Sequence, residues 1–206
     1  MNELTFFASV AGLYFMLAVS PGPNFLIVSV AAAGKSKHYA TFVILGIATA
    51  SVFWASLAAM GLGLALAQLQ DSQRILQLFG GMYLLYIAFK TLKNASLPLT
   101  NDIDSSTEGN IFSGYLSGLL TNLGNPKSLI FFSSVFATLY TPEITTMLKV
   151  WSVAVVGAVA IIWYLVVAFV FSSNKLQNIY TRSKKRIDYI VGGLLGFFSL
   201  KLILNL

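Results

Sequence analysis

Six long apolar stretches constrain the fold of this chain more than any other feature. An α-helix needs about 20 mostly apolar residues to cross a hydrocarbon core about 30 Å thick. Hydrophobic residues make up 57% of the chain and charged residues only 10%, against about 25% in soluble domains. The sequence therefore predicts an all-α membrane protein with six transmembrane helices, at residues 4–33, 39–66, 75–92, 111–140, 146–171 and 187–205.

Several functional classes lack the residues that they need. The chain has no cysteine, which excludes disulfides, thiolate metal sites and thiol redox relays, and its one histidine, His38, lies between two lysines in a short polar gap. No Ser/His, His/Glu or paired-aspartate set lies within the spans, so we expect no enzyme. We also expect no cofactor and no metal. The net charge is +6, but the basic residues lie between apolar segments, a pattern that does not indicate nucleic-acid binding.

The distribution of Lys and Arg predicts the topology. The loops after helices one, three and five hold nine of them, the opposite side holds three (Arg74, Lys149 and Lys201), and Lys127 falls inside an apolar run. By the positive-inside rule the three basic loops are cytoplasmic and both termini lie outside. The nine are Lys35, Lys37, Lys90, Lys93, Lys175, Arg182, Lys184, Lys185 and Arg186.

The chain divides into two similar halves. A polar linker at residues 94–110 separates a first three-helix unit, residues 1–93, from a second, residues 111–206. Units with an odd number of spans must lie upside down relative to each other, so a repeat here is an inverted repeat, as in many secondary transporters. Chance similarity between glycine- and leucine-rich segments is the alternative. Pro23 in the first unit matches Pro126 in the second, 103 residues later. Gly80-Gly81, followed by Lys90, matches Gly192-Gly193, followed by Lys201.

Proline and glycine interrupt spans one and four inside the membrane. Ser20-Pro21-Gly22-Pro23-Asn24 lies in span one and Gly124-Asn125-Pro126-Lys127 in span four. Proline removes a backbone donor and clashes with the preceding turn, so we expect helices one and four to be broken near the midplane. Free backbone groups at that depth need a protein or water-filled environment, which predicts a cavity between the breaks. A simple kink in each helix is the alternative.

The broken helices predict a binding site for a small zwitterion. Asn125 is a good N-cap before Pro126, and Gly22 or Ser20 is suited to cap a half-helix that begins near Pro23. Two helix N-termini with Lys127 then hold a carboxylate, and carbonyls that end the first half-helices receive an ammonium group. If span four is shifted, Lys127 reaches the headgroups instead. The predicted site residues are Ser20, Pro21, Gly22, Pro23, Asn24, Thr121, Asn122, Asn125, Pro126 and Lys127.

Other noticeable residues have simpler interpretations. Two G-x-x-x-G pairs, at Gly114 and Gly192, predict close helix packing, and aromatic packing is the expected role of Tyr14. All seven acidic residues lie in loops or at span ends, so no carboxylate is expected at the midplane to relay protons. Asp188, beside Arg186, is the one acid near the predicted pathway, and an interfacial ion pair is its expected role.

Four segments resemble the LysE/RhtB family of amino-acid exporters, and its threonine-efflux branch in particular. They are SPGPN at 20–24, GIATASVFWASLAAMGL at 46–62, GGMYLLYIAFKTL at 80–92 and LLTNLGNPKSLIFFSSVF at 119–136. The resemblance implies export of small neutral amino acids, such as threonine or homoserine, driven by the proton gradient across a bacterial inner membrane. Members of that branch can carry Asp after P-G-P, where this chain has Asn24.

We therefore expect a multi-pass secondary transporter that works by alternating access. Its expected partners are the lipid bilayer and a small amino acid, with protons as the candidate coupling ion and a homo-oligomer left open. The alternative is a membrane scaffold or assembly factor without a substrate, whose G-x-x-x-G faces and basic loop would contact partner proteins.

Overall fold

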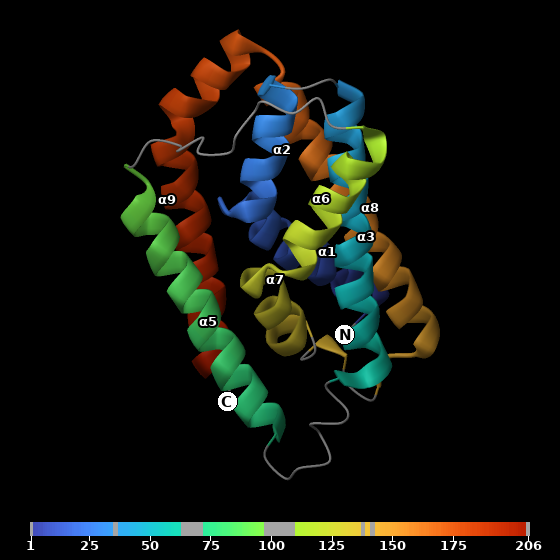
Figure 1. Ribbon diagram of the computed structural model, residues 1–206. Coiled ribbons are helices and arrows are strands. Elements are labelled where there is room, and N and C mark those ends of the chain that lie inside the picture. The colour runs from blue at the N-terminus through green and yellow to red at the C-terminus, as the bar shows by residue number, and fades with distance from the viewer. Residues whose placement is uncertain are drawn as a thin grey trace.

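The computed structural model of the protein describes residues 2–34, 37–62, 72–96, 110–136, 139–140 and 143–204, and within them every regular element is helical (Figure 1). This confirms the predicted all-α class. The elements in chain order are α1 (Glu3–Val19), α2 (Pro23–Gly34), α3 (Lys37–Leu57), the π-helical turn η1 (Ala58–Leu62), α5 (Ser72–Asn94), α6 (Ile111–Leu123), α7 (Pro126–Ile130), the π-helical turn η2 (Phe131–Phe136), α8 (Thr146–Phe171) and α9 (Asn174–Leu204).

Length and composition identify the strongest membrane-span candidates. Two helical segments among the described residues suffice to cross a bilayer alone, Lys37–Met60 and Thr146–Phe171. A third candidate arises if α1 and α2 count as one span, and these two helices are bent by 65° at the break between them. Most of the predicted linker, including Pro98 and its three acidic residues, lies outside the described residues.

The last helix begins earlier than predicted. The sequence places the start of span six at residue 187, whereas α9 begins at Asn174, directly after a two-residue connection from α8. The five basic residues assigned to a loop here, from Lys175 to Arg186, therefore lie on a helix. Lys, Arg and Gln are good helix formers, and this segment contains no Gly or Pro to interrupt it.

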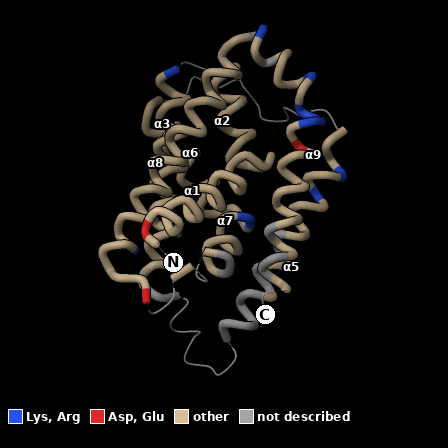
Figure 2. The backbone as a smooth tube through the Cα atoms, turned by 180° about the vertical axis from the view of Figure 1, so that it is seen from behind, with Lys and Arg blue, Asp and Glu red and all other residues tan. Residues whose placement is uncertain are grey.

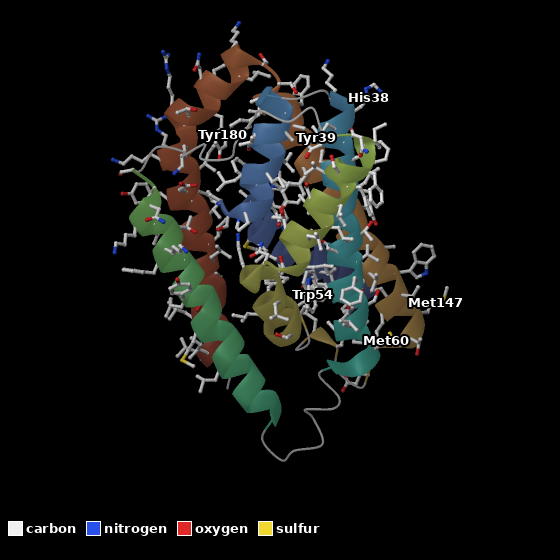
Figure 3. All side chains as sticks on the ribbon, viewed as in Figure 1. His38, Tyr39, Trp54, Met60, Met147 and Tyr180 are labelled. Atoms are coloured by element: carbon white, nitrogen blue, oxygen red, sulfur yellow. The ribbon has the colours of Figure 1, made fainter. Side chains whose placement is uncertain are left out.

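Most of the basic residues gather at one end of the molecule. Figure 2 shows Lys and Arg concentrated where α2 approaches α3, where α5 ends and where α8 turns into α9. We call this the basic end. His38 and Tyr180 lie there, and Met60 and Met147 lie at the opposite end (Figure 3). His38 is exposed, as expected, but it belongs to the first turn of α3 rather than to a loop.

Glycines bring α3 and α6 into close contact. A Cβ on Gly118 would overlap the Val43 carbonyl oxygen, and one on Gly46 would overlap the Tyr115 carbonyl oxygen. The packing predicted for the first G-x-x-x-G pair is therefore confirmed. In the second pair, Gly192 packs against Leu92 of α5 in the antiparallel α5–α9 pair.

Candidate functional site

The first helix break separates α1 from α2 and leaves carbonyl groups at the end of α1. α1 ends at Val19 and α2 begins at Pro23, where the sequence predicted an interruption. Of the two predicted caps, Gly22 takes the position, because its carbonyl accepts a hydrogen bond from the Leu26 amide at 3.0 Å. The Ser20 hydroxyl instead pairs with the Thr91 hydroxyl of α5 at 3.1 Å.

Side chains from the second half of the chain satisfy these carbonyls. Lys127 Nζ donates to the Leu17 oxygen at 2.8 Å and to the Ser20 oxygen at 2.7 Å. Trp163 Nε1, from α8, donates to the Ala18 oxygen at 3.1 Å. Such carbonyls need partners because no intrahelical donor reaches them. The ammonium group at this position, which the sequence analysis assigned to a substrate, is thus the protein's own Lys127.

The second break, between α6 and α7, is closed by its own residues. α6 ends at Leu123, and Asn125 is the N-cap of α7 with Pro126 in the first turn, as predicted. Asn125 Oδ1 accepts a hydrogen bond from the Lys127 amide at 3.0 Å. The Gly124 amide bonds the Leu120 oxygen at 2.9 Å. α7 then continues directly into η2.

A chain of buried amides links the two breaks. Asn24 Nδ2 donates to Asn122 Oδ1 at 2.9 Å, and Asn125 Nδ2 lies 3.4 Å from Asn24 Oδ1. The Ser128 hydroxyl also donates to Asn122 Oδ1, at 2.6 Å. All four side chains are buried, and each of the three amides makes at least one hydrogen bond to another of them.

The same network reaches α3 and α1. Asn122 Nδ2 donates to the Ile47 oxygen and to Ser51 Oγ, each at 2.8 Å. The Tyr14 hydroxyl lies 2.8 Å from Ser51 Oγ, so Tyr14 has a polar contact in addition to the aromatic packing expected of it. The site is therefore held in place by α1, α2, α3, α6 and the start of α7.

A cavity of about 410 Å³ adjoins the breaks. It is also lined by the end of α5, which lies at the basic end (Figure 2). Its walls come from both breaks, from the last turns of α5 and from α9. Among the described residues that line it, three are lysines, Lys90, Lys127 and Lys184, and one is acidic, Asp188. The cavity therefore carries a net positive charge, which favours an anionic group such as a carboxylate.

The structure brings most of the predicted site residues together. Asn24 and Asn122 belong to the amide network. Thr121 follows Leu120 on α6 and lines neither this cavity nor the water-sized void of about 10 Å³ beyond the break. Pro126 lies in the first turn of α7, but its side chain is outside the described residues. The predicted residues that line the main cavity are Ser20, Pro21, Gly22, Pro23, Asn125 and Lys127.

Ser51, Thr91 and Lys90 belong to the network or the cavity but were not among the predicted site residues. The ion pair predicted for Asp188 is present, with Lys184 as its partner. Asp188 Oδ2 contacts Lys184 Nζ at 2.6 Å, one turn away on the same face of α9, rather than Arg186. The spacing of four residues was a usable signal, because residues i and i+4 lie on the same face of a helix. It was hidden because the segment was interpreted as a loop.

Comparisons with known proteins find relatives along nearly the whole chain. The chain matches the family model described as LysE type translocator over residues 15–206. It is 31% identical to the threonine efflux proteins of Salmonella typhi and Escherichia coli (strain K12), over 98% of this chain and 99% of each relative. It is 29% identical to an uncharacterized membrane protein of Haemophilus influenzae, over 91% of this chain and 90% of that relative.

No solved structure matches the chain significantly. The family match and the relatives span nearly the whole sequence, so they cover both breaks, the cavity and α9. By length and composition, two helices of the described residues could cross a membrane, and a third candidate arises if α1 and α2 form one span. This chain is a membrane transport protein that belongs to the LysE family of translocators.

Proposed function

We propose that this protein exports small neutral amino acids, of the threonine and homoserine type, from the cytoplasm across the bacterial inner membrane. The relatives named as threonine efflux proteins support the choice of substrate. We propose the proton gradient as the driving force, with Lys127 as the titratable group at the breaks. The mechanism is alternating access around the site between α1–α2 and α6–α7.

The observation that carries this proposal is the position of Lys127 in the cavity. Two of its three N–H donors bind the carbonyls of Leu17 and Ser20, and the third has no partner among the described residues. A substrate carboxylate that enters the cavity can accept a hydrogen bond from this third N–H group. The cavity volume of about 410 Å³ falls within the range of about 300–1,000 Å³ that is usual for small-molecule sites.

Helix contacts support two inverted repeats of three spans. If span one (α1 and α2) corresponds to span four (α6, α7 and η2), then α3 corresponds to α8 and α5 to α9. The contact of α3 with α6 then has its counterpart in the contact of α8 with α1. The α3–α8 and α5–α9 pairs each join equivalent helices. Such a two-fold arrangement lets the same site be opened from either side.

Charge supports an orientation with the basic end in the cytoplasm and both termini outside. Positively charged connections remain on the cytoplasmic side of inner-membrane proteins. The cavity adjoins the basic end, so in this orientation it faces the cytoplasm. This is the conformation in which an exporter takes up its substrate.

The test is export from proteoliposomes loaded separately with labelled threonine, homoserine, leucine and lysine, under an imposed pH gradient. We expect efflux of a neutral amino acid that depends on the gradient and is lost in Lys127→Ala. Lys93→Ala is the matched control, because Lys93 is exposed and does not line the cavity. We expect it to export like the wild type.

Two results would contradict the proposal. One is the absence of efflux for every amino acid from folded protein in sealed liposomes. The other is undiminished efflux from Lys127→Ala, which would remove the site from the transport cycle. Efflux that ignores the pH gradient would overturn the proposed driving force and leave the substrate class intact.

A further inference from the structure

Asp188 is a buried carboxylate whose hydrogen bonding is incomplete. The residue is 1% exposed and lines the cavity from α9. Its Oδ2 atom contacts Lys184 Nζ, which also donates to the Asn94 oxygen at 3.2 Å. Its Oδ1 atom is buried and has no hydrogen-bond partner among the described residues. Half of the carboxylate is therefore satisfied by the fold and half is not.

An unsatisfied carboxylate oxygen in such a place is unusual. An ionised carboxylate has about four lone-pair sites, and burial of a charged acceptor without a donor is costly. Nearly all buried polar atoms in folded proteins have a partner, and those without one require an explanation. Asp188 lines the cavity, so a side-chain rotation that turns Oδ1 toward it lets a ligand supply the missing donor.

The chemistry of the cavity identifies the donor. Asp188 is the one acid among the described lining residues, which otherwise include three lysines that suit a carboxylate. An amino acid carries an α-ammonium group with three N–H donors, and charged donors form the stronger hydrogen bonds to carboxylates. A ligand without an ammonium group could contact the three lysines but would have no charged donor for Asp188.

A continuous wall joins Asp188 to the breaks. Thr91 of α5 is buried and pairs with Ser20, whose carbonyl oxygen binds Lys127. Thr91, Ser20 and Asp188 all line the same cavity. Asp188 and Lys127 thus line one cavity. Asp188 lies on the side formed by α9, and Lys127 lies on the side formed by the breaks.

We propose that Asp188 Oδ1 is the ammonium-binding atom of the cavity and makes the transporter specific for amino acids over carboxylic acids that lack the amine. This rests on the proposed function, because it assumes an amino-acid substrate. Lys184 holds the carboxylate in place through Oδ2 and leaves Oδ1 for the ligand. Asp188 is thus a specificity-determining residue, and Lys184 is a positioning residue.

The test compares two ligands that differ only in the amine, L-threonine and 3-hydroxybutyrate. Affinity is measured by calorimetry on purified full-length wild-type protein and on Asp188→Asn. We expect the wild type to bind threonine at least about tenfold more tightly than 3-hydroxybutyrate, the factor expected for a hydrogen bond to a charged group. Asp188→Asn should lose this preference and bind 3-hydroxybutyrate at least as tightly as the wild type does.

Two further variants separate recognition from a structural role. Asp188→Glu keeps the charge and should retain a preference for threonine. Lys185→Gln, which changes an exposed neighbour outside the cavity, should match the wild type for both ligands. If Asp188→Asn aggregates, the double variant Lys184→Gln/Asp188→Asn, which leaves no unpaired buried charge, takes its place.

Three outcomes are distinguishable. If Asp188→Asn still prefers threonine to 3-hydroxybutyrate as the wild type does, the inference is overturned and the proposed function is unaffected. An equal loss of affinity for both ligands also overturns it, because that result indicates a structural role for Asp188. If the wild type binds no amino acid at all, the proposed function fails and the inference fails with it.

Discussion

The two helix breaks at the centre of this transporter look alike in sequence but are stabilised differently. At the α1–α2 break, the carbonyls of Leu17, Ala18 and Ser20, which no helical amide reaches, are satisfied by Lys127 and Trp163, more than 100 residues away in the chain. At the α6–α7 break, Asn125 and the neighbouring backbone supply the hydrogen bonds. The first break therefore depends on tertiary structure, and the second is largely self-sufficient.

The difference shows where such a protein can move. A break that its own cap residue closes survives when neighbouring helices separate. A break that depends on a lysine from another helix changes its hydrogen bonding whenever the two helices shift. Of the two, the α1–α2 break is thus the one whose geometry is coupled to the rest of the molecule.

The largest expected effect comes from Lys127→Met, which keeps the aliphatic stem and removes both hydrogen bonds to the α1–α2 break. We expect a loss of stability of about 3 kcal/mol, since hydrogen bonds to charged groups contribute about 1.5–3 kcal/mol each. Denaturant unfolding in detergent measures it. A loss no larger than that of Asn125→Ala would contradict the contrast between the two breaks.

The next effect concerns the amide network that joins the breaks. Asn122→Ala leaves the Asn24 amide and the Ser128 hydroxyl without their acceptor in a buried site. We expect a loss of about 2 kcal/mol, the usual cost of a buried polar group left unsatisfied. The same unfolding experiment applies, with Thr121→Ala as the control because Thr121 lines neither cavity. Equal stability of the two variants would show that the breaks are independent.

A comparable effect, caused by crowding and not by a lost hydrogen bond, tests how firmly the helix before the second break is held. Gly118→Ala places a methyl group against the Val43 carbonyl oxygen, and overpacking of this kind costs about 1–3 kcal/mol. Gly193→Ala is the matched control, because a Cβ there has nothing within 4 Å. We expect a lowered melting temperature for the first variant alone. Similar melting temperatures would indicate that α3 and α6 separate easily.

The smallest effect is expected at the self-sufficient break. Asn125→Ala removes the N-cap of α7, which typically costs about 1 kcal/mol, and Asn125→Asp should recover most of it. Thermal unfolding of the three proteins checks this order. A failure of the aspartate variant to recover stability would assign the role of Asn125 to its contact with Asn24 instead of the cap.

The helical class and the places where helices stop were accessible from sequence because they depend on local chemistry. Pro23 and Pro126 lack an amide hydrogen wherever they lie, and Asn125 before proline is a cap by its own geometry. The glycines of α6 were also identified, since a small-residue stripe indicates close packing without specifying the partner.

The contacts that build the site could not be predicted in this way. Nothing in the chain near Lys127 indicates that its ammonium group binds the end of α1, because that contact spans 110 positions. The pairing of Ser20 with Thr91 likewise depends on how α5 packs. The start of α9 was placed too late because polarity was interpreted as a loop, although a polar segment can be helical outside the membrane.

The position of Lys127 also bears on whether transport requires a counter-substrate. A strict exchanger needs a solute in its site during both halves of the cycle. Here the side chain itself supplies the cation for the Leu17 and Ser20 carbonyls, so the unloaded site has no bare backbone acceptors at those two positions. In the proposed transport cycle, the empty carrier can therefore return without cargo at little cost at this point, which is the condition for net flux in one direction.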